Sequence, residues 1–265
     1  MTNAVGTTMD ADRINVKVRI SHRYGDIEVH DKVEFTVRDN EFLCICGPSG
    51  CGKTTLLDIL AGIMNPTEGE VLIHGEPVDP KRQNIAFVFQ EPSTLPWLNV
   101  WENIAIGLRI KQRPAAEVRR VVDDIIDFVR LKGFEKYYPH QISGGMKQRV
   151  AIARAFATDA DVIQLVEPFL SLDQPTRERM QHEVLNIWKH RKRTIIFVTH
   201  NLEEAVFLGD RMIILSARPA RIEADIAVAL PRPRDTLSPE FTQLRSRCAQ
   251  ILSTISVEST ETIEI

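Results

Sequence analysis

The sequence predicts an α/β fold built around a parallel β-sheet. Short apolar runs rich in β-branched residues alternate along the chain with segments of helical periodicity, as expected for strand–helix–strand units. Four of these runs are almost continuously apolar, which is typical of parallel strands covered on both faces. A glycine-rich loop also joins one such run to a helical segment.

The pattern places most elements directly. The clearest helix is expected over 115–131, with its valines and isoleucines on one face and Gly133 positioned to cap its end. Residues 91–154 contain no evident core strand, so they are expected to be a mostly helical insertion. The chain from 216 begins as a loop and ends in a polar tail, 257–265, that is expected to fray. The expected strands are 14–20, 42–46, 85–89, 162–166, 194–199 and 211–215.

Composition narrows the class of protein. The chain has 265 residues and a formal net charge of −3, so it suits one large domain and is a poor candidate for nucleic-acid binding, which needs clustered Lys and Arg. No apolar run approaches the ~18 residues of a membrane span. Residues 1–13 lack the basic-then-apolar order of a signal peptide. The four cysteines do not have the spacing of zinc ligands, and we expect them to be reduced thiols in a cytoplasmic protein. They are Cys44, Cys46, Cys51 and Cys248.

The expected strand 42–46 is followed by a loop with the pattern G-x-x-x-x-G-K-[ST] and then by an apolar helix. Its glycines let backbone N–H groups curl around phosphate oxygens, and the helix N-terminus contributes the positive end of its dipole. Lys53 is expected to reach the β- and γ-phosphates of a nucleotide, and the Thr54 hydroxyl to ligate Mg²⁺. The whole phosphate loop comprises Gly47, Pro48, Ser49, Gly50, Cys51, Gly52, Lys53, Thr54 and Thr55.

A second turn selects among phosphate-loop proteins. Ser143, Gly144 and Gly145 precede an apolar helix, where Ser143 is a good N-cap and the glycines permit close backbone approach. Together with the following Met-Lys-Gln-Arg, this turn resembles the signature motif of the ATP-binding cassette (ABC) transporter family. Other motifs of that family occur here in the same order, over about residues 12–235, and include Tyr24, Gln90, Glu167, Asp173 and His200.

The resemblance implies a role for each of these positions. Glu167 would orient the attacking water, His200 would contact the γ-phosphate, and Gln90 would sense both Mg²⁺ and the water. Tyr24 would stack on adenine, although an aromatic residue there also suits simple packing. Asp173 would belong to the family's D-loop.

The resemblance also implies an architecture. The core would be a RecA-like phosphate-loop NTPase with an antiparallel β edge, made of residues 12–90 and 155–235. Residues 91–154 would be the helical signature subdomain, and 236–265 a short C-terminal helix or tail. ATP would lie between the phosphate loop of one subunit and the signature turn of a second copy, arranged head to tail.

Three short segments resemble the importer branch that serves nitrate, sulfonate, taurine and related anions: 138–141, 216–222 and 230–234. That branch implies integral-membrane permease partners, indirectly a solute-binding protein, no nucleic acid, and a peripheral place on the cytoplasmic face of the inner membrane. The apolar stretch 95–104 would face the permease, although Trp101 equally suits packing inside the helical insertion.

One position departs from the family. Where cassettes carry an Asp that helps to hold Mg²⁺, just before the catalytic Glu, this chain has Val166. Asp161 lies ~16 Å away along an extended strand, too far to substitute. Gln164 shares a face with Val166 and is the first candidate replacement. We expect ATP to bind and hydrolysis to be slowed, unless the residue is a variant or engineered change.

The alternative function is a cassette that binds ATP, hardly hydrolyses it and acts as a nucleotide-dependent dimerisation or regulatory module. A soluble cassette ATPase of DNA repair or translation would need a long coiled-coil insertion or a second cassette, and the sequence contains neither.

Overall fold

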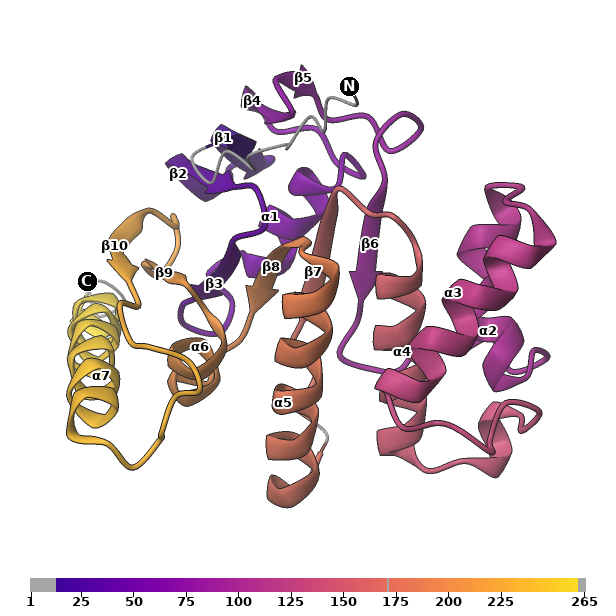
Figure 1. The fold of residues 1–265 in the computed structure, drawn as a ribbon. Coiled ribbons are helices and arrows are strands. Elements are labelled where there is room, and N and C mark those ends of the chain that lie inside the picture. The colour runs from indigo at the N-terminus through magenta and orange to yellow at the C-terminus, as the bar shows by residue number, and fades with distance from the viewer. Residues whose placement is uncertain (1–12, 171, 262–265) are drawn as a thin grey trace, which may run out of the picture.

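The structure is a computed structural model that describes residues 13–170 and 172–261, with side chains described as far as Ile255. A six-stranded sheet forms its centre, in the order β10-β9-β3-β8-β7-β6 (Figure 1). Every neighbouring pair in it is parallel except β10–β9, so the predicted α/β class with an antiparallel edge is confirmed. Its strands are β3 (Phe42–Cys46), β6 (Ile85–Val88), β7 (Val162–Val166), β8 (Thr194–Val198), β9 (Arg211–Leu215) and β10 (Ile222–Ala227).

A second, antiparallel sheet was only partly predicted. Its order is β2-β1-β4-β5, and β1 continues well past the expected end at residue 20, so that Tyr24 is its last residue. Buried and exposed residues alternate along β2, which leaves no apolar run to mark it. The strands are β1 (Ile14–Tyr24), β2 (Ile27–Arg38), β4 (Glu68–Ile73) and β5 (Glu76–Pro77).

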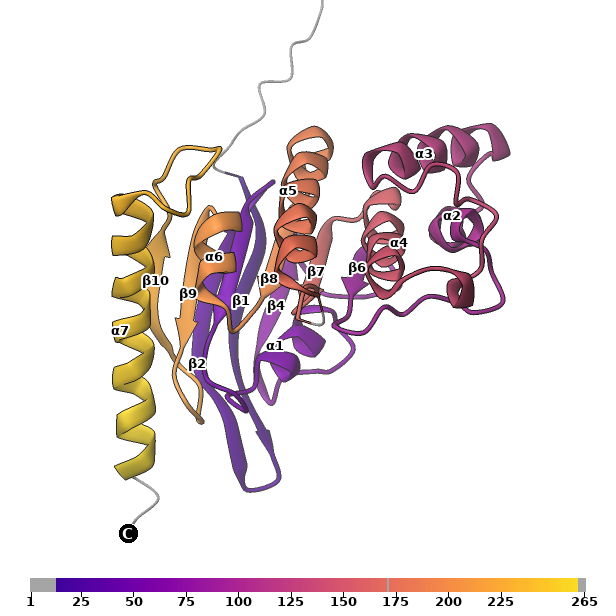
Figure 2. The ribbon, with the colours of Figure 1, turned by 90° about the horizontal axis from the view of Figure 1, so that it is seen from below.

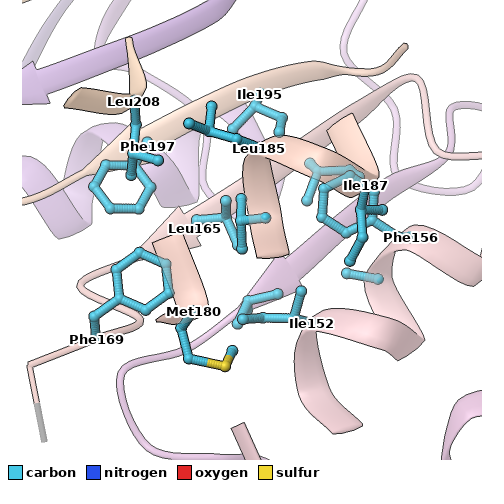
Figure 3. Close-up of a cluster of buried hydrophobic side chains, with 14 of the residues drawn as sticks. Ile152, Phe156, Leu165, Phe169, Met180, Leu185, Ile187, Ile195, Phe197 and Leu208 are labelled. Atoms are coloured by element: carbon cyan, nitrogen blue, oxygen red, sulfur yellow. The ribbon is translucent and has the colours of Figure 1, made fainter. Parts of the chain in front are cut away.

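Both faces of the central sheet are buried, which explains its apolar strands. One face packs against α1 (Lys53–Leu60) and the antiparallel sheet. The other packs against α4 (Gly144–Ala157), α5 (Gln174–Arg191) and α6 (Leu202–Leu208). Figure 3 shows part of this second core, where Ile152 and Phe156 of α4 lie near Leu165 and Ile195 of the sheet.

The predicted helical insertion is present. Between residues 89 and 161, all of which the structure describes, the chain forms helices and loops and no strand. These helices are α2 (Val100–Ile110), α3 (Ala115–Phe128), the short 3₁₀ helix η1 (Pro139–Gln141) and α4. The expected boundary at 154/155 falls inside α4, which packs against α2 and α3 as well as against the sheet.

The prediction that the helix over 115–131 ends at Gly133 was wrong. Helix α3 ends at Phe128, and Arg130 has a left-handed φ of 54°, so the chain has already turned away. Gly133 lies in the turn that follows, where its own φ of 89° favours glycine. The apolar pattern continued because Val129 and Leu131 are buried outside the helix.

The C-terminal region is more regular than expected. Strand β10 interrupts the segment predicted as a loop, and α7 (Pro239–Glu261) includes the first five residues of the tail expected to fray. Phe241, Cys248 and Ile255 are buried along α7, which lies beside α6 and the β10 edge (Figures 1 and 2). The last four residues, 262–265, lie outside the described residues. So do residues 1–12, which make up most of the segment that was considered for a signal peptide.

All four cysteines are free and buried. Burial raises the pKa of each thiol, most strongly at Cys44 and Cys46 in β3. Among the residues that the structure describes, none of the helices combines the length and apolar character that crossing a bilayer would need.

Arg234 is a buried cation that secures the end of α6. Its Nη1 donates to the backbone oxygens of Val206, Phe207 and Gly209, at 2.7, 3.0 and 2.6 Å. The last carbonyls of a helix have no partner within it and carry the negative end of its dipole, so this cation satisfies them on both counts.

We therefore expect Arg234→Leu to lower the free energy of unfolding by about 3 kcal/mol, since it strands several buried carbonyls. Denaturant unfolding measures the change. The matched control is Arg245→Leu, which removes an exposed arginine whose carboxylate partner is also exposed and should cost at most about 1 kcal/mol. Equal losses in the two variants would contradict this account of Arg234.

Candidate functional site

The phosphate loop joins β3 to α1 at the carboxyl edge of the central sheet. Gly50 and Gly52 have φ values of 76° and 106°, a region that glycine adopts readily. A Cβ at Gly52 would lie 2.6 Å from Val29 Cγ1 and 2.9 Å from His30 Nε2. Strand β2 therefore packs so closely on the loop that no larger residue fits.

A cavity of about 410 Å³ opens above this loop. Most of its lining was predicted, because it includes Tyr24, Glu167 and six residues of the loop. Gly47 and Cys51 are buried instead and support the loop from within. Val29 and Arg218 were not predicted. The full lining is Tyr24, Val29, Ser49, Gly50, Gly52, Lys53, Thr54, Thr55, Glu167 and Arg218.

Two side chains of the cavity are positioned for its chemistry. The Lys53 ammonium donates to the backbone oxygens of Gly47 and Pro48, at 2.8 and 2.7 Å, so it lies against the loop that would hold phosphate. The Tyr24 hydroxyl donates to Met64 Sδ at 3.2 Å, and the Tyr24 ring packs edge-on against His22. Tyr24 is half exposed, which leaves ring surface open to a ligand.

Glu167 and His200 form a direct pair. Nδ1 of His200 lies 2.6 Å from Oε2 of Glu167. Since the carboxylate can only accept when ionised, the histidine donates from Nδ1 and its Nε2 faces elsewhere. Glu167 has a left-handed φ of 42°, a strained conformation for a residue with a side chain, fixed by its N–H bond to the Val198 oxygen at 2.8 Å. It borders both the main cavity and a smaller hollow beside His200.

Val166 ends β7 directly before Glu167 and is half-buried. It brings an apolar side chain to the position where a carboxylate was expected. Gln164, the candidate replacement, is 0% exposed and lies on the face packed against α1 and the antiparallel sheet. Neither its amide oxygen nor its nitrogen has a partner within the described part of the chain. Neither Gln164 nor Val166 is part of the cavity lining, so the role of Gln164 as a metal partner stays a prediction.

Gln90 is exposed on the loop after β6 and does not line the cavity. Its loop is attached to α4 instead. The Phe89 oxygen accepts from Gln148 at 3.4 Å, and the Ser93 hydroxyl accepts from Arg154 at 2.7 Å. Two side chains of the helix that begins at the signature turn therefore contact the loop that carries Gln90.

The remaining predicted residues cap two helices, away from the cavity lining. Ser143 accepts from the Met146 N–H at 3.3 Å and starts α4, and Asp173 accepts from the Thr176 N–H at 2.9 Å and starts α5. A Cβ at Gly145 would lie 3.3 Å from Thr176, so the two turns are adjacent. Ser143, Gly144 and Asp173 are exposed, and Ser171 lies outside the described residues.

The cavity fits a magnesium-bound nucleoside triphosphate at its phosphate end. A loop that tolerates no Cβ at Gly52 presents backbone N–H groups, Lys53 supplies a cation, and the exposed Thr54 hydroxyl supplies the oxygen ligand that Mg²⁺ prefers. The carboxylate of Glu167 stands at the margin of the same space.

His30 was also missed by the sequence analysis. It is fully buried on β2, and its Nε2 lies 3.1 Å from the Gly52 oxygen. Because a carbonyl only accepts, Nε2 carries the proton, and Nδ1 has no partner among the described residues. Burial lowers the pKa of His30 to about 4. The imidazole is therefore neutral and supports the phosphate loop through its hydrogen bond to Gly52. No sequence pattern indicates this role.

Comparison with known proteins gives a consistent result. A family model described as ABC transporter matches residues 30–170. The chain is 44% identical to an uncharacterized ABC transporter ATP-binding protein of Methanocaldococcus jannaschii, over 91% of this chain and 93% of that protein. It is 45% identical to the aliphatic sulfonates import ATP-binding protein SsuB of Bacillus cereus, over 87% of this chain and 90% of that protein.

Solved structures agree on the fold. A dimeric, post-hydrolysis ATP-binding cassette bound to ADP and Pi superposes with a TM-score of 0.69 at 31% identity, over 82% of this chain and 100% of that chain. The cbiO1 protein of Clostridium perfringens, part of an ABC transporter complex, superposes with a TM-score of 0.75 at 22% identity, over 92% of this chain and 100% of that one.

We expect His30 to make the stability of the fold depend on pH. The unfolded chain binds a proton at this residue near its ordinary pKa of 6.5, whereas the folded chain resists it down to about 4. Stability rises with pH wherever the unfolded state binds more protons, so the free energy of unfolding should fall by up to about 3 kcal/mol as pH drops through this window. Denaturant unfolding at several pH values measures the slope.

His30→Gln should remove that part of the slope between pH 6.5 and 4. Carboxylates titrate in the same window, so the informative quantity is the difference between the variant and the natural chain. His182→Gln, which removes an exposed imidazole, is the matched control. A slope unaltered by His30→Gln would contradict the assignment.

Proposed function

This chain belongs to the ABC transporter family and is an ATP-binding ATPase of that family, and we propose that it powers an importer of small organic or inorganic anions. The anions would be of the nitrate, sulfonate and taurine type. The sulfonate import named for the relative from Bacillus cereus supports this substrate class, together with the three segments that resemble the same branch.

The observation that carries the enzymatic part is the Glu167–His200 pair at the margin of the phosphate cavity. Lys53 and the loop N–H groups would bind the β- and γ-phosphates of ATP. Glu167 would accept a hydrogen bond from the attacking water and orient it in line with the γ-phosphate. Nδ1 of His200 already donates its hydrogen bond to Glu167. A second hydrogen bond, from Nε2 to a phosphate oxygen, would need a proton on that nitrogen as well, which only the imidazolium form carries.

Thr54 would hold Mg²⁺, with Gln90 reaching it when its loop approaches the cavity. The ion, when bound, neutralises charge on the phosphate oxygens. Val166 offers it no carboxylate, and Gln164, two residues earlier in β7, is fully buried. Loss of such a supporting group typically costs 10–100-fold in metal affinity or activity, so we propose that hydrolysis is slowed to that extent.

A second copy of the chain would complete the site. Ser143, Gly144, Gly145 and Asp173 do not line this chain's cavity, and the two turns that carry them are adjacent. In a head-to-tail dimer they would close over the partner's ATP. The dimeric cassette bound to ADP and Pi supports this arrangement.

The transported solute would cross the membrane through permease subunits, delivered by a solute-binding protein. The chain would then be peripheral, on the cytoplasmic face of the inner membrane. Trp97 is 69% exposed in the stretch 95–104, which suits contact with a permease. Trp101 is different, because its indole donates to Asp123 at 2.9 Å and packs within the helical subdomain.

Val166 favours one alternative: a cassette that dimerises on ATP, hardly hydrolyses it and serves as a regulatory module. Glu167 and His200 are in place in either case. The two functions differ in the rate of phosphate release and not in the affinity for ATP.

Mg²⁺-dependent phosphate release by the purified chain separates them. We expect Val166→Asp to raise the rate tenfold or more, because a carboxylate returns beside the metal position. Glu167→Gln should abolish what remains, because the water loses its orienting group. Phosphate release is measured over a range of Mg²⁺ concentrations, and the increase should be largest at low Mg²⁺.

Val166→Asn is the matched control, since it has the size of Asp without the charge. It should leave the rate close to that of the natural chain. An unaltered rate in Val166→Asp, beside a natural chain as fast as other cassettes, would overturn the slowed-hydrolysis proposal. A natural rate near zero that Val166→Asp fails to raise would favour the regulatory module.

A further inference from the structure

Arg218 lines the phosphate cavity and takes no part in the proposed hydrolysis of ATP. Its Nη2 lies 3.4 Å from the position that a Cβ on Gly50 would occupy. It thus stands over the middle of the phosphate loop. Among the described residues that line the cavity, Lys53 and Arg218 are the two cations.

The loop that carries Arg218 is firmly attached. It joins β9 to β10 and is closed on itself by the Arg221 N–H, which donates to the Ser216 hydroxyl at 2.8 Å. Ala220 then docks on β2, donating to the Val29 oxygen at 2.8 Å and accepting from the Asp31 N–H at 3.0 Å.

The same stretch of β2 supports the phosphate loop, since Val29 and His30 enclose Gly52. Arg218 and the loop therefore share one support. The guanidinium does not reach the cavity on a free segment of chain.

Arg218 also differs from Arg221 in lacking a partner among the described residues. Arg221, three residues on, donates from Nε to Asp31 at 2.7 Å. Within the part of the chain that the structure describes, the Arg218 side chain has neither a hydrogen bond nor an ion pair, and it is exposed. An exposed, unpaired guanidinium at a phosphate cavity is free to bind a ligand anion.

We propose that Arg218 binds the phosphate chain of the nucleotide in this cavity. The inference rests on the proposed placement of ATP over the phosphate loop. A guanidinium presents a planar fork of donors that matches phosphate oxygens, and such charge-assisted bonds are stronger than neutral ones.

This cation changes how the site depends on metal. A guanidinium attracts phosphate without Mg²⁺, and its share of the binding is largest when no Mg²⁺ neutralises the same oxygens. In a chain with Val166 in place of a carboxylate, Arg218 keeps ATP bound where the metal is weakly held. ATP binding then depends on the Mg²⁺ concentration less strongly than ATP hydrolysis does.

Titration calorimetry with ATP, in EDTA and in Mg²⁺, tests the proposal. Arg218→Gln should bind ATP about tenfold more weakly in EDTA, with a smaller loss in Mg²⁺. Arg218→Lys should recover part of the affinity. Arg82→Gln, which removes an arginine with a 78% exposed side chain outside the cavity lining, should bind as the natural chain does. Lys53→Ala measures how much binding belongs to the phosphate loop.

Wild-type affinity in Arg218→Gln, beside lost binding in Lys53→Ala, would overturn the role of Arg218 and leave the nucleotide site standing. Equal losses in Arg218→Gln and Arg82→Gln would overturn it as well, because net charge alone would then explain both. If Lys53→Ala bound ATP as tightly as the natural chain, the nucleotide would lie elsewhere and the proposed function itself would fail. Far-ultraviolet circular dichroism confirms that each variant is folded.

Discussion

Parallel pairing of β9, β3, β8 and β7 is the constraint on which the site depends. It brings four carboxyl ends to one edge of the sheet, where the phosphate loop follows β3, Glu167 follows β7 and His200 follows β8. The loop bearing Arg218 follows β9. Open α/β sheets bind their ligands at such an edge. Burial of both faces fixes the register of these strands, so residues far apart in sequence meet with little freedom.

Most of the central sheet could be predicted, because full burial leaves an unbroken apolar run. Strand β2 could not, since its outer face is solvated and its sequence alternates. Helix α7 was underestimated although its apolar residues recur at helical spacing. Its partly buried Leu244, Ile251 and Leu252 pack on the same core as the buried Phe241, Cys248 and Ile255. The early end of α3 could not be predicted from the apolar pattern, because Val129 and Leu131 are buried although they lie beyond the helix.

The site shows a similar division. The phosphate loop is local in sequence and was predicted almost in full, and so was the presence of Glu167 at the cavity. Val29, His30 and Arg218 act through contacts between distant elements, which no short motif records. One signal did exist: a basic loop after a strand beside β3 has to emerge near the phosphates. Gln164 shares a face with Val166 and is fully buried, and a buried amide without a partner among the described residues costs about 1–3 kcal/mol.

The burial of all four cysteines has a practical consequence for spectroscopy. Thiol-reactive probes attack the thiolate, and these thiols are both shielded from reagent and resistant to ionisation. We therefore expect the four natural cysteines to react slowly with maleimide reagents. A single cysteine introduced on the exposed side of α5 or α7 could then carry a dye or spin label without replacement of the four natural cysteines.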